Sequence, residues 1–155
     1  MFMKQEHKEL LVKDLSSRLP YGVKVQIDLQ SNICPPITCK VCNIEFTETE
    51  GSFIGVETSP DTYNEFREFL CKPYLFPLSS MTDELWDKEF RGCGITEFTR
   101  DSFKYGCETL EFNNSNANLS SIVRFTNQLI KNHFDIYGLI PMGLAIDATN
   151  LGIYE

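Results

Sequence analysis

The chain has 155 residues, enough for a folded domain that buries about two-thirds of the surface its unfolded form exposes. Hydrophobic residues make up 42% and charged residues 23%, which excludes an intrinsically disordered protein. The 22 acidic and 14 basic side chains give a net charge of −8, which disfavours nucleic acid as a partner because phosphate binding depends on clustered lysine and arginine.

The N-terminal half predicts one helix followed by three strands. Apolar residues at helical spacing predict a helix over residues 4–18, which Pro20 ends. Strict alternation predicts a strand over residues 23–29, and two further strands are expected at residues 37–46 and 52–58. We expect these strands to form an antiparallel meander under the helix, which gives an α+β fold.

The C-terminal half is expected to be mainly helical. An apolar stripe predicts a helix over residues 60–70, and the prolines that follow predict an extended segment over residues 72–78. A short helix should end near Phe90, with its cap at Ser79, Ser80 or Thr82. Residues 96–112 fit either a strand pair or a short helix, and residues 119–132 give the strongest helical pattern, with an apolar stripe that includes Phe125, Leu129 and Ile130. No repeat or linker divides these elements, so residues 1–155 are expected to form a single domain with an N-terminal and a C-terminal helix.

Acidic residues are concentrated in one stretch of the chain. Seven carboxylates lie between Glu45 and Glu68, against Arg67 as the one basic residue there. This stretch fits a solvated face, and it also fits a docking surface for a basic protein or a mimic of nucleic acid.

The sequence predicts a soluble protein. Charged residues interrupt the N-terminal segment before any apolar run reaches the length of a signal peptide, and no segment approaches the ~20 apolar residues that span a bilayer. We therefore expect a cytoplasmic protein without a membrane partner.

Six cysteines are present, and without a secretory signal they are expected to be free thiols rather than disulfides. The closest group is Cys34, Cys39 and Cys42. If Cys39 and Cys42 lie on one strand, their side chains point to opposite faces and cannot share a metal ion without a tight turn. Zinc binding by this group stays open as an alternative.

Three sequence blocks carry a resemblance to a protein family. They are KDLSSRLPYGVKVQI at residues 13–27, PLSSMTDE at residues 77–84 and HFDIYGLIPMGLAIDAT at residues 133–149. With these blocks the chain resembles a widespread family of uncharacterised small proteins encoded by gut bacteria and their phages or prophages. The resemblance implies a mobile-element protein that acts inside a host bacterial cell, and it brings no established activity with it.

The last of these blocks contains the most versatile pair of side chains. Asp135 can accept hydrogen bonds from backbone amides in a turn, and Gly138 and Gly143 suit unusual dihedral angles. In this interpretation His133 and Asp135 form a structural turn. In a functional interpretation they line a pocket in which the imidazole binds a ligand or moves a proton.

Known catalytic motifs are absent from the sequence. It contains no GK[ST] phosphate loop, no GxGxxG, no GxSxG and no HExxH, and no cofactor is expected. An enzyme remains an alternative hypothesis, built on His133 with Asp135 and a thiol or carboxylate that folding brings near.

The preferred hypothesis is a non-catalytic binding protein that engages a host protein or sequesters a small anionic, nucleotide-derived signalling molecule, and so counters host defence. Stacking and anion contacts would come from seven side chains: Tyr74, Phe76, Arg91, Arg100, Arg124, His133 and Asp135. A virion or assembly protein is a third hypothesis, and a homo-oligomer is an open alternative.

Overall fold

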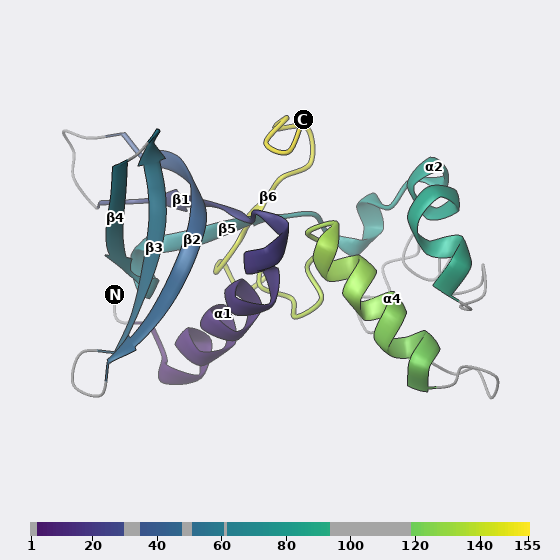
Figure 1. Cartoon of the computed structure of the whole chain (residues 1–155), viewed down its shortest axis with the longest axis horizontal. Helices are drawn as coiled ribbons and strands as arrows, with labels where there is room; N and C mark the ends of the chain where they lie inside the picture. The colour runs from purple at the N-terminus through teal and green to yellow at the C-terminus, as the bar shows by residue number, and fades with distance from the viewer. Residues whose placement is uncertain (1–2, 30–34, 48–50, 61, 94–118) are drawn as a thin grey trace.

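A computed structural model of the chain describes residues 3–29, 35–47, 51–60, 62–93 and 119–155, and its centre is a six-stranded sheet (Figure 1). The strands lie in the order β4-β3-β2-β1-β5-β6. Neighbouring strands pair antiparallel except β5 and β6, which are parallel. Their bounds are β1 Lys24–Ile27, β2 Ile37–Thr47, β3 Gly51–Ser59, β4 Thr62–Arg67, β5 Cys71–Leu75 and β6 Ile146–Asp147. The expected α+β class with an antiparallel meander of β1, β2 and β3 is confirmed.

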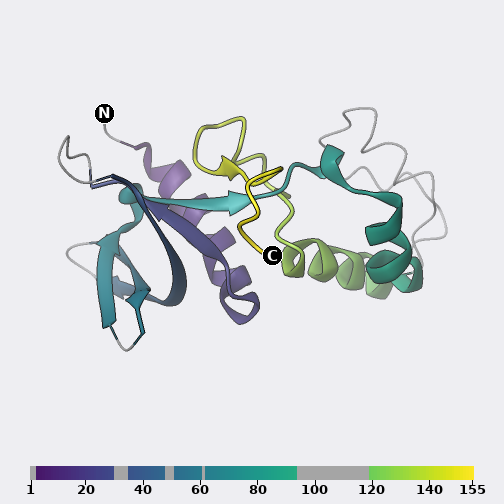
Figure 2. The same ribbon diagram turned by 90° about the horizontal axis from the view of Figure 1, so that it is seen from above.

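The two longer helices are α1 (Gln5–Arg18) and α4 (Leu119–Lys131). In Figures 1 and 2, α1 lies beside the sheet, and α4 lies farther out with the short helix α2 (Asp83–Leu85). A π-helical turn, Trp86–Phe90, and a 3₁₀ turn, Arg91–Cys93, follow α2. Further 3₁₀ turns are Leu19–Tyr21, Glu68–Leu70 and Leu78–Ser80. Within the described ranges, no helix has the length and apolar character to cross a membrane.

The main core lies between α1 and the sheet. Leu11 and Leu15 of α1 are fully buried, and so are Val25 and Ile27 of β1, the alternating residues that predicted this strand. Burial of such side chains stabilises the fold by about 1.5–3 kcal/mol each. Residues 139–145 add Leu139, Leu144 and Ala145 to the same cluster, so the C-terminal block closes the core.

A second cluster joins α4 to the segment around α2. Trp86, Phe90 and Phe125 pack with ring centroids 5.4–5.9 Å apart. The stripe expected on the C-terminal helix is confirmed, because Phe125, Leu129 and Ile130 are all buried. Of the three caps considered for the α2 segment, Thr82 fills the position, and its hydroxyl oxygen accepts the Leu85 amide at 3.2 Å.

The helix expected over residues 60–70 is wrong. This segment forms β4 and the 3₁₀ turn Glu68–Leu70, and β4 pairs along β3 from Phe53↔Arg67 to Ser59↔Thr62. The apolar stripe misled because its members do not share one buried face: Tyr63 and Phe69 are 46% and 42% exposed in the structure. Backbone pairing with β3 therefore outweighed local propensity.

A β-bulge in β2 sets which side chains face α1. Cys39 is buried and Cys42 is exposed, as opposite strand faces require. The register shifts between Val41 and Asn43, so Ile44 packs against the same core as Val41. Because of the bulge, the side chain of Ile44 lies on the face of the sheet that α1 covers.

Gly55 is required by a close contact on the outer face of the hairpin. The Tyr63 hydroxyl donates to Asn43 Oδ1 directly over Gly55, and an added Cβ would overlap both atoms. We expect Gly55→Ala to lower the free energy of unfolding by about 1–3 kcal/mol in urea titrations, because Tyr63 must leave its place. In a Tyr63→Ala background the same change should cost much less; an equal cost there would refute the steric explanation.

Candidate functional site

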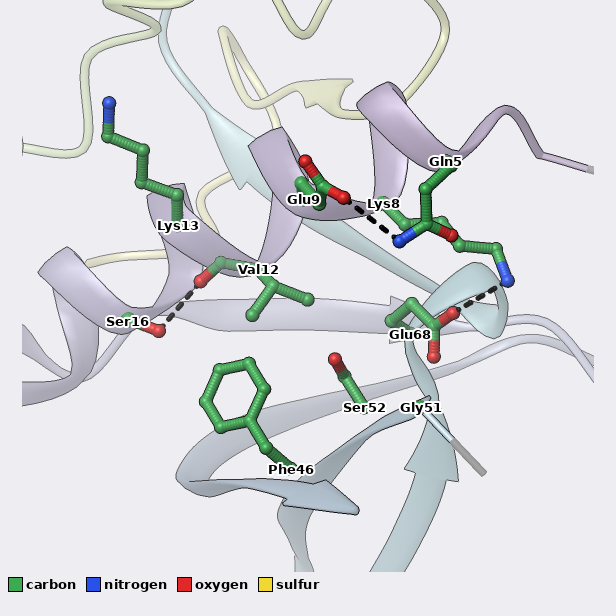
Figure 3. A pocket seen from close by; sticks show the side chains of 10 residues that line it. All are labelled: Gln5, Lys8, Glu9, Val12, Lys13, Ser16, Phe46, Gly51, Ser52 and Glu68. Atoms are coloured by element: carbon green, nitrogen blue, oxygen red, sulfur yellow. Dashed lines mark hydrogen bonds and ion pairs between the residues drawn. The ribbon is translucent and has the colours of Figure 1, made fainter. Parts of the chain in front are cut away.

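A groove of about 390 Å³ separates α1 from the adjoining ends of β2 and β3 (Figure 3), and we call it the α1–hairpin groove. This volume suits a small ligand or one side chain of a partner. The residues that line it are Gln5, Lys8, Glu9, Val12, Lys13, Ser16, Phe46, Gly51, Ser52 and Glu68.

One face of α1 forms one wall of the groove. Gln5, Glu9, Val12 and Ser16 follow each other at spacings of three and four, so they share one face of α1. Val12 is only 5% exposed and supplies apolar surface in the middle of this wall. Ser16 donates its hydroxyl to the Val12 carbonyl oxygen at 2.7 Å, which leaves the hydroxyl oxygen as an acceptor.

The hairpin supplies the opposite wall. Phe46 lies near the end of β2, beyond the part of the sheet that the main core covers, and is 70% exposed. Gly51 begins β3 with a φ of 92°, a conformation that other residues rarely adopt. Both Gly51 and the next residue, Ser52, line the groove. Phe46 thus offers an open aromatic face to whatever enters.

Glu68 closes one end of the groove with a buried carboxylate. Its residue exposure is 3%, although glutamate is almost never buried without full pairing. Oε1 forms an ion pair with Lys8 Nζ at 3.1 Å, whereas Oε2 is buried and has no hydrogen-bond partner among the described residues. A buried acceptor left in this state costs on the order of 1–3 kcal/mol.

The remaining charged groups in the groove already have contacts. Lys13 Nζ lies 5.1 Å from the centre of the Tyr137 ring, and Gln5 donates to Glu9 at 3.0 Å. In Figure 3 the ends of Lys13 and Glu9 point away from the middle of the groove. Among the described groups of the groove, Glu68 Oε2 is therefore the buried acceptor that still lacks a hydrogen-bond donor.

Three of the residues predicted as binding candidates, Phe76, His133 and Asp135, lie together, but at another place. An isolated parallel β-bridge pairs Phe76 with Phe134. The Phe76 amide donates to the His133 carbonyl oxygen at 2.9 Å, and the Asp135 amide donates to the Phe76 carbonyl oxygen at 2.8 Å. The Asp135 carboxylate accepts the amides of Leu139 and Ile140 at 2.9 and 2.8 Å. Both carboxylate oxygens hold the turn, as the structural interpretation expects.

His133 is 7% exposed and stacks on Tyr154, with ring centroids 4.0 Å apart and an interplanar angle of 12°. Burial, together with the positive charge of Arg18, lowers the pKa of His133 to about 4, so the imidazole is neutral at pH 7. Its φ of 59° is unusual for a residue with a side chain. Its Nδ1 has no hydrogen-bond partner in the described part of the chain. These features describe a packed ring with one unpaired nitrogen.

Neither Tyr74 nor Phe76 lines the groove. Tyr74 is 4% exposed, with its hydroxyl 3.2 Å from Gln26 Nε2 and 3.0 Å from Thr38 Oγ1. Phe76 packs against Phe134 and Tyr154.

Two of the predicted arginines lie at the outer end of the helical part. Arg91 and Arg124 are exposed, and Arg124 donates to Gly92 O at 3.4 Å. Arg124 is nine positions before His133, about 13 Å along a helix axis, so these side chains do not converge on the imidazole. Arg100 lies outside the described residues.

A buried ion pair that the sequence pattern did not indicate connects α1 to the end of α4. Arg18 and Asp14 both have 0% exposure, and the guanidinium donates twice to Asp14, at 2.7 and 2.8 Å. Arg18 also donates to the carbonyl oxygens of Ile130 at 3.2 Å and Phe134 at 2.7 Å. Burial raises the pKa of Asp14, outweighing the opposing effect of Arg18. The i, i+4 spacing was visible in the sequence, but such pairs are usually on the surface.

Three of the described thiols, those of Cys39, Cys71 and Cys93, are not activated. Burial raises the pKa of Cys39 and Cys93, and raises that of Cys71 to about 12, so all three are protonated at neutral pH. The described residues contain no group of three or more His, Cys, Asp or Glu side chains arranged to hold a metal ion. Cys34 lies outside them, so the zinc alternative for Cys34, Cys39 and Cys42 stays a prediction.

Comparison of the chain with protein-family models, curated proteins and solved structures gives no match.

Proposed function

We propose that the protein is a non-catalytic binding protein of a phage or other mobile element, and that it holds part of a host component in the α1–hairpin groove. The observation that carries this proposal is Glu68 Oε2, a buried acceptor at the end of an open groove that no described residue provides with a hydrogen bond. A ligand that brings a donor to this carboxylate offsets a cost that the free protein bears. In the context that the family resemblance implies, such binding would counter host defence.

The state of the chemically versatile side chains supports binding rather than catalysis. Asp135 uses both carboxylate oxygens to hold a turn, and His133 is stacked and neutral. A general acid or base needs a reachable proton partner, and a nucleophilic thiol needs a lowered pKa. Neither requirement is met at these residues or at Cys39, Cys71 and Cys93.

The proposal can be tested by blocking the groove. Natively purified protein is analysed by mass spectrometry for retained small molecules and for co-purifying host proteins. We expect Ser52→Trp, which places an indole in the groove, to lose what the unaltered protein retains. Ser59→Trp is the matched control, because Ser59 is exposed at the other end of β3. If both variants retain the same molecules as the unaltered protein, the groove is not the binding site.

A further inference from the structure

We infer that the group bound in the α1–hairpin groove is a cation, a primary ammonium or guanidinium on a short alkyl stem, held by Glu68 and Phe46. This inference rests on the proposed function and names the ligand chemistry. It differs from the anionic metabolite that the sequence suggested, and it agrees with the docking of a basic partner on the acidic stretch of residues 45–68.

The first step is the half-satisfied carboxylate. The side chain of Glu68 is 4% exposed, and one of its carboxylate oxygens forms an ion pair with Lys8. An ionised carboxylate can accept about four hydrogen bonds from its two oxygens. An ammonium or guanidinium group carries several N–H donors and a positive charge, so it suits this site better than a neutral donor does.

The second step is the place of Lys8. Its side chain is 33% exposed, and its Nζ lies 3.1 Å from Glu68 Oε1 and 5.9 Å from the centre of the Phe69 ring. Lys8 is therefore an internal ammonium that already occupies part of the site. When this flexible side chain swings outward, the carboxylate becomes reachable from the groove, and a ligand cation replaces Lys8 with similar contacts.

The third step is the apolar surface beside the carboxylate. Figure 3 shows Val12 and Ser52 near the middle of the groove, between Glu68 on one side and the ring of Phe46 on the other. Val12 can cover an alkyl stem, and the exposed face of Phe46 can attract a cation through the negative face of its ring.

An anionic ligand would find no comparable partner. Lys8 is paired with Glu68, and Lys13 lies over Tyr137. The carboxylates of Glu9 and Glu68 would repel an anion, as would the net charge of −8.

Four probes with short unbranched stems separate the effect of charge from that of the stem: butylammonium, butylguanidinium and 1-butanol, which share a butyl group, and butyrate, whose carboxylate brings its chain to the same four carbons. Each is titrated into ¹⁵N-labelled full-length protein, and amide shifts are followed at the groove residues. We expect both cations to bind with Kd on the order of millimolar, and at least tenfold more tightly than 1-butanol or butyrate.

Three substitutions test the roles of the side chains. Glu68→Gln keeps the shape and removes the charge, and should weaken cation binding at least tenfold. Lys8→Met removes the internal competitor and should strengthen it about threefold or more. Phe46→Ala should weaken it by a similar factor, and because Phe46 is 70% exposed the fold should persist. Tyr63→Ala, which removes an exposed ring that does not line the groove, should have no effect.

The outcomes separate this inference from the proposed function. Preferred binding of butyrate, equal binding of 1-butanol, no binding of any probe, or unchanged binding by Glu68→Gln would each overturn the cation site. The proposed function fails only if Ser52→Trp also leaves the retained molecules unchanged. With the cation site established, spermidine and a lysine residue blocked at both ends distinguish a free amine from a protein side chain as the source.

Discussion

Replacing Arg18 by methionine is expected to lower the free energy of unfolding by about 3–5 kcal/mol. The substitution leaves the Asp14 carboxylate buried without its guanidinium, and it removes the donors to the Ile130 and Phe134 carbonyl oxygens. The measurement is chemical denaturation followed by circular dichroism at neutral pH.

Two further variants test this explanation. Arg91→Met, the same change at an exposed position, should cost less than about 0.5 kcal/mol. Asp14→Leu combined with Arg18→Met should cost less than the sum of the two single changes, because no unpaired carboxylate remains. Strict additivity would show that the two side chains do not act as a pair.

Acidification is expected to destabilise the protein through His133. Its folded-state pKa of about 4 lies below the ordinary value of 6.5, so between these pH values the unfolded state binds more protons than the folded state. Stability that is fully present above pH 6.5 is therefore lost as the pH falls towards 4. The shift corresponds to about 3 kcal/mol, which urea titrations at pH 7 and pH 4.5 can measure.

The contribution of His133 is isolated by comparison with His133→Asn. Asparagine tolerates the positive φ of this position but does not titrate, so the variant should lose less stability between pH 7 and pH 4.5. His7→Gln is the control, since it removes the other histidine. If His133→Asn and the unaltered protein show the same dependence on pH, protonation of His133 does not limit stability.

Local patterns predicted the elements whose burial follows from their own sequence. The alternation of Val25 and Ile27 gave β1, and the stripe of Phe125 and Leu129 gave α4, because these side chains are buried where the period places them. The segment of residues 60–70 failed because its state depends on a partner strand, β3, that local spacing does not describe.

The groove could not be predicted from the sequence for a related reason. Glu68 stood in a segment expected to be helical, and Phe46 was an ordinary member of an alternating strand. The importance of each arises when α1 places Lys8 and Val12 opposite them. The sequence did indicate that the stretch of residues 45–68 is acidic, and its last carboxylate, Glu68, lies in the groove.

The hydrogen bonds of Arg18 also constrain when the protein can fold during synthesis. Two of its acceptors, the carbonyl oxygens of Ile130 and Phe134, lie 112 and 116 positions later in the chain. A nascent chain can therefore form α1 and the meander early, but the guanidinium of Arg18 stays without these acceptors until the residues after α4 have left the ribosome. The native contacts of the first helix are thus completed only when residues 130–134 are available.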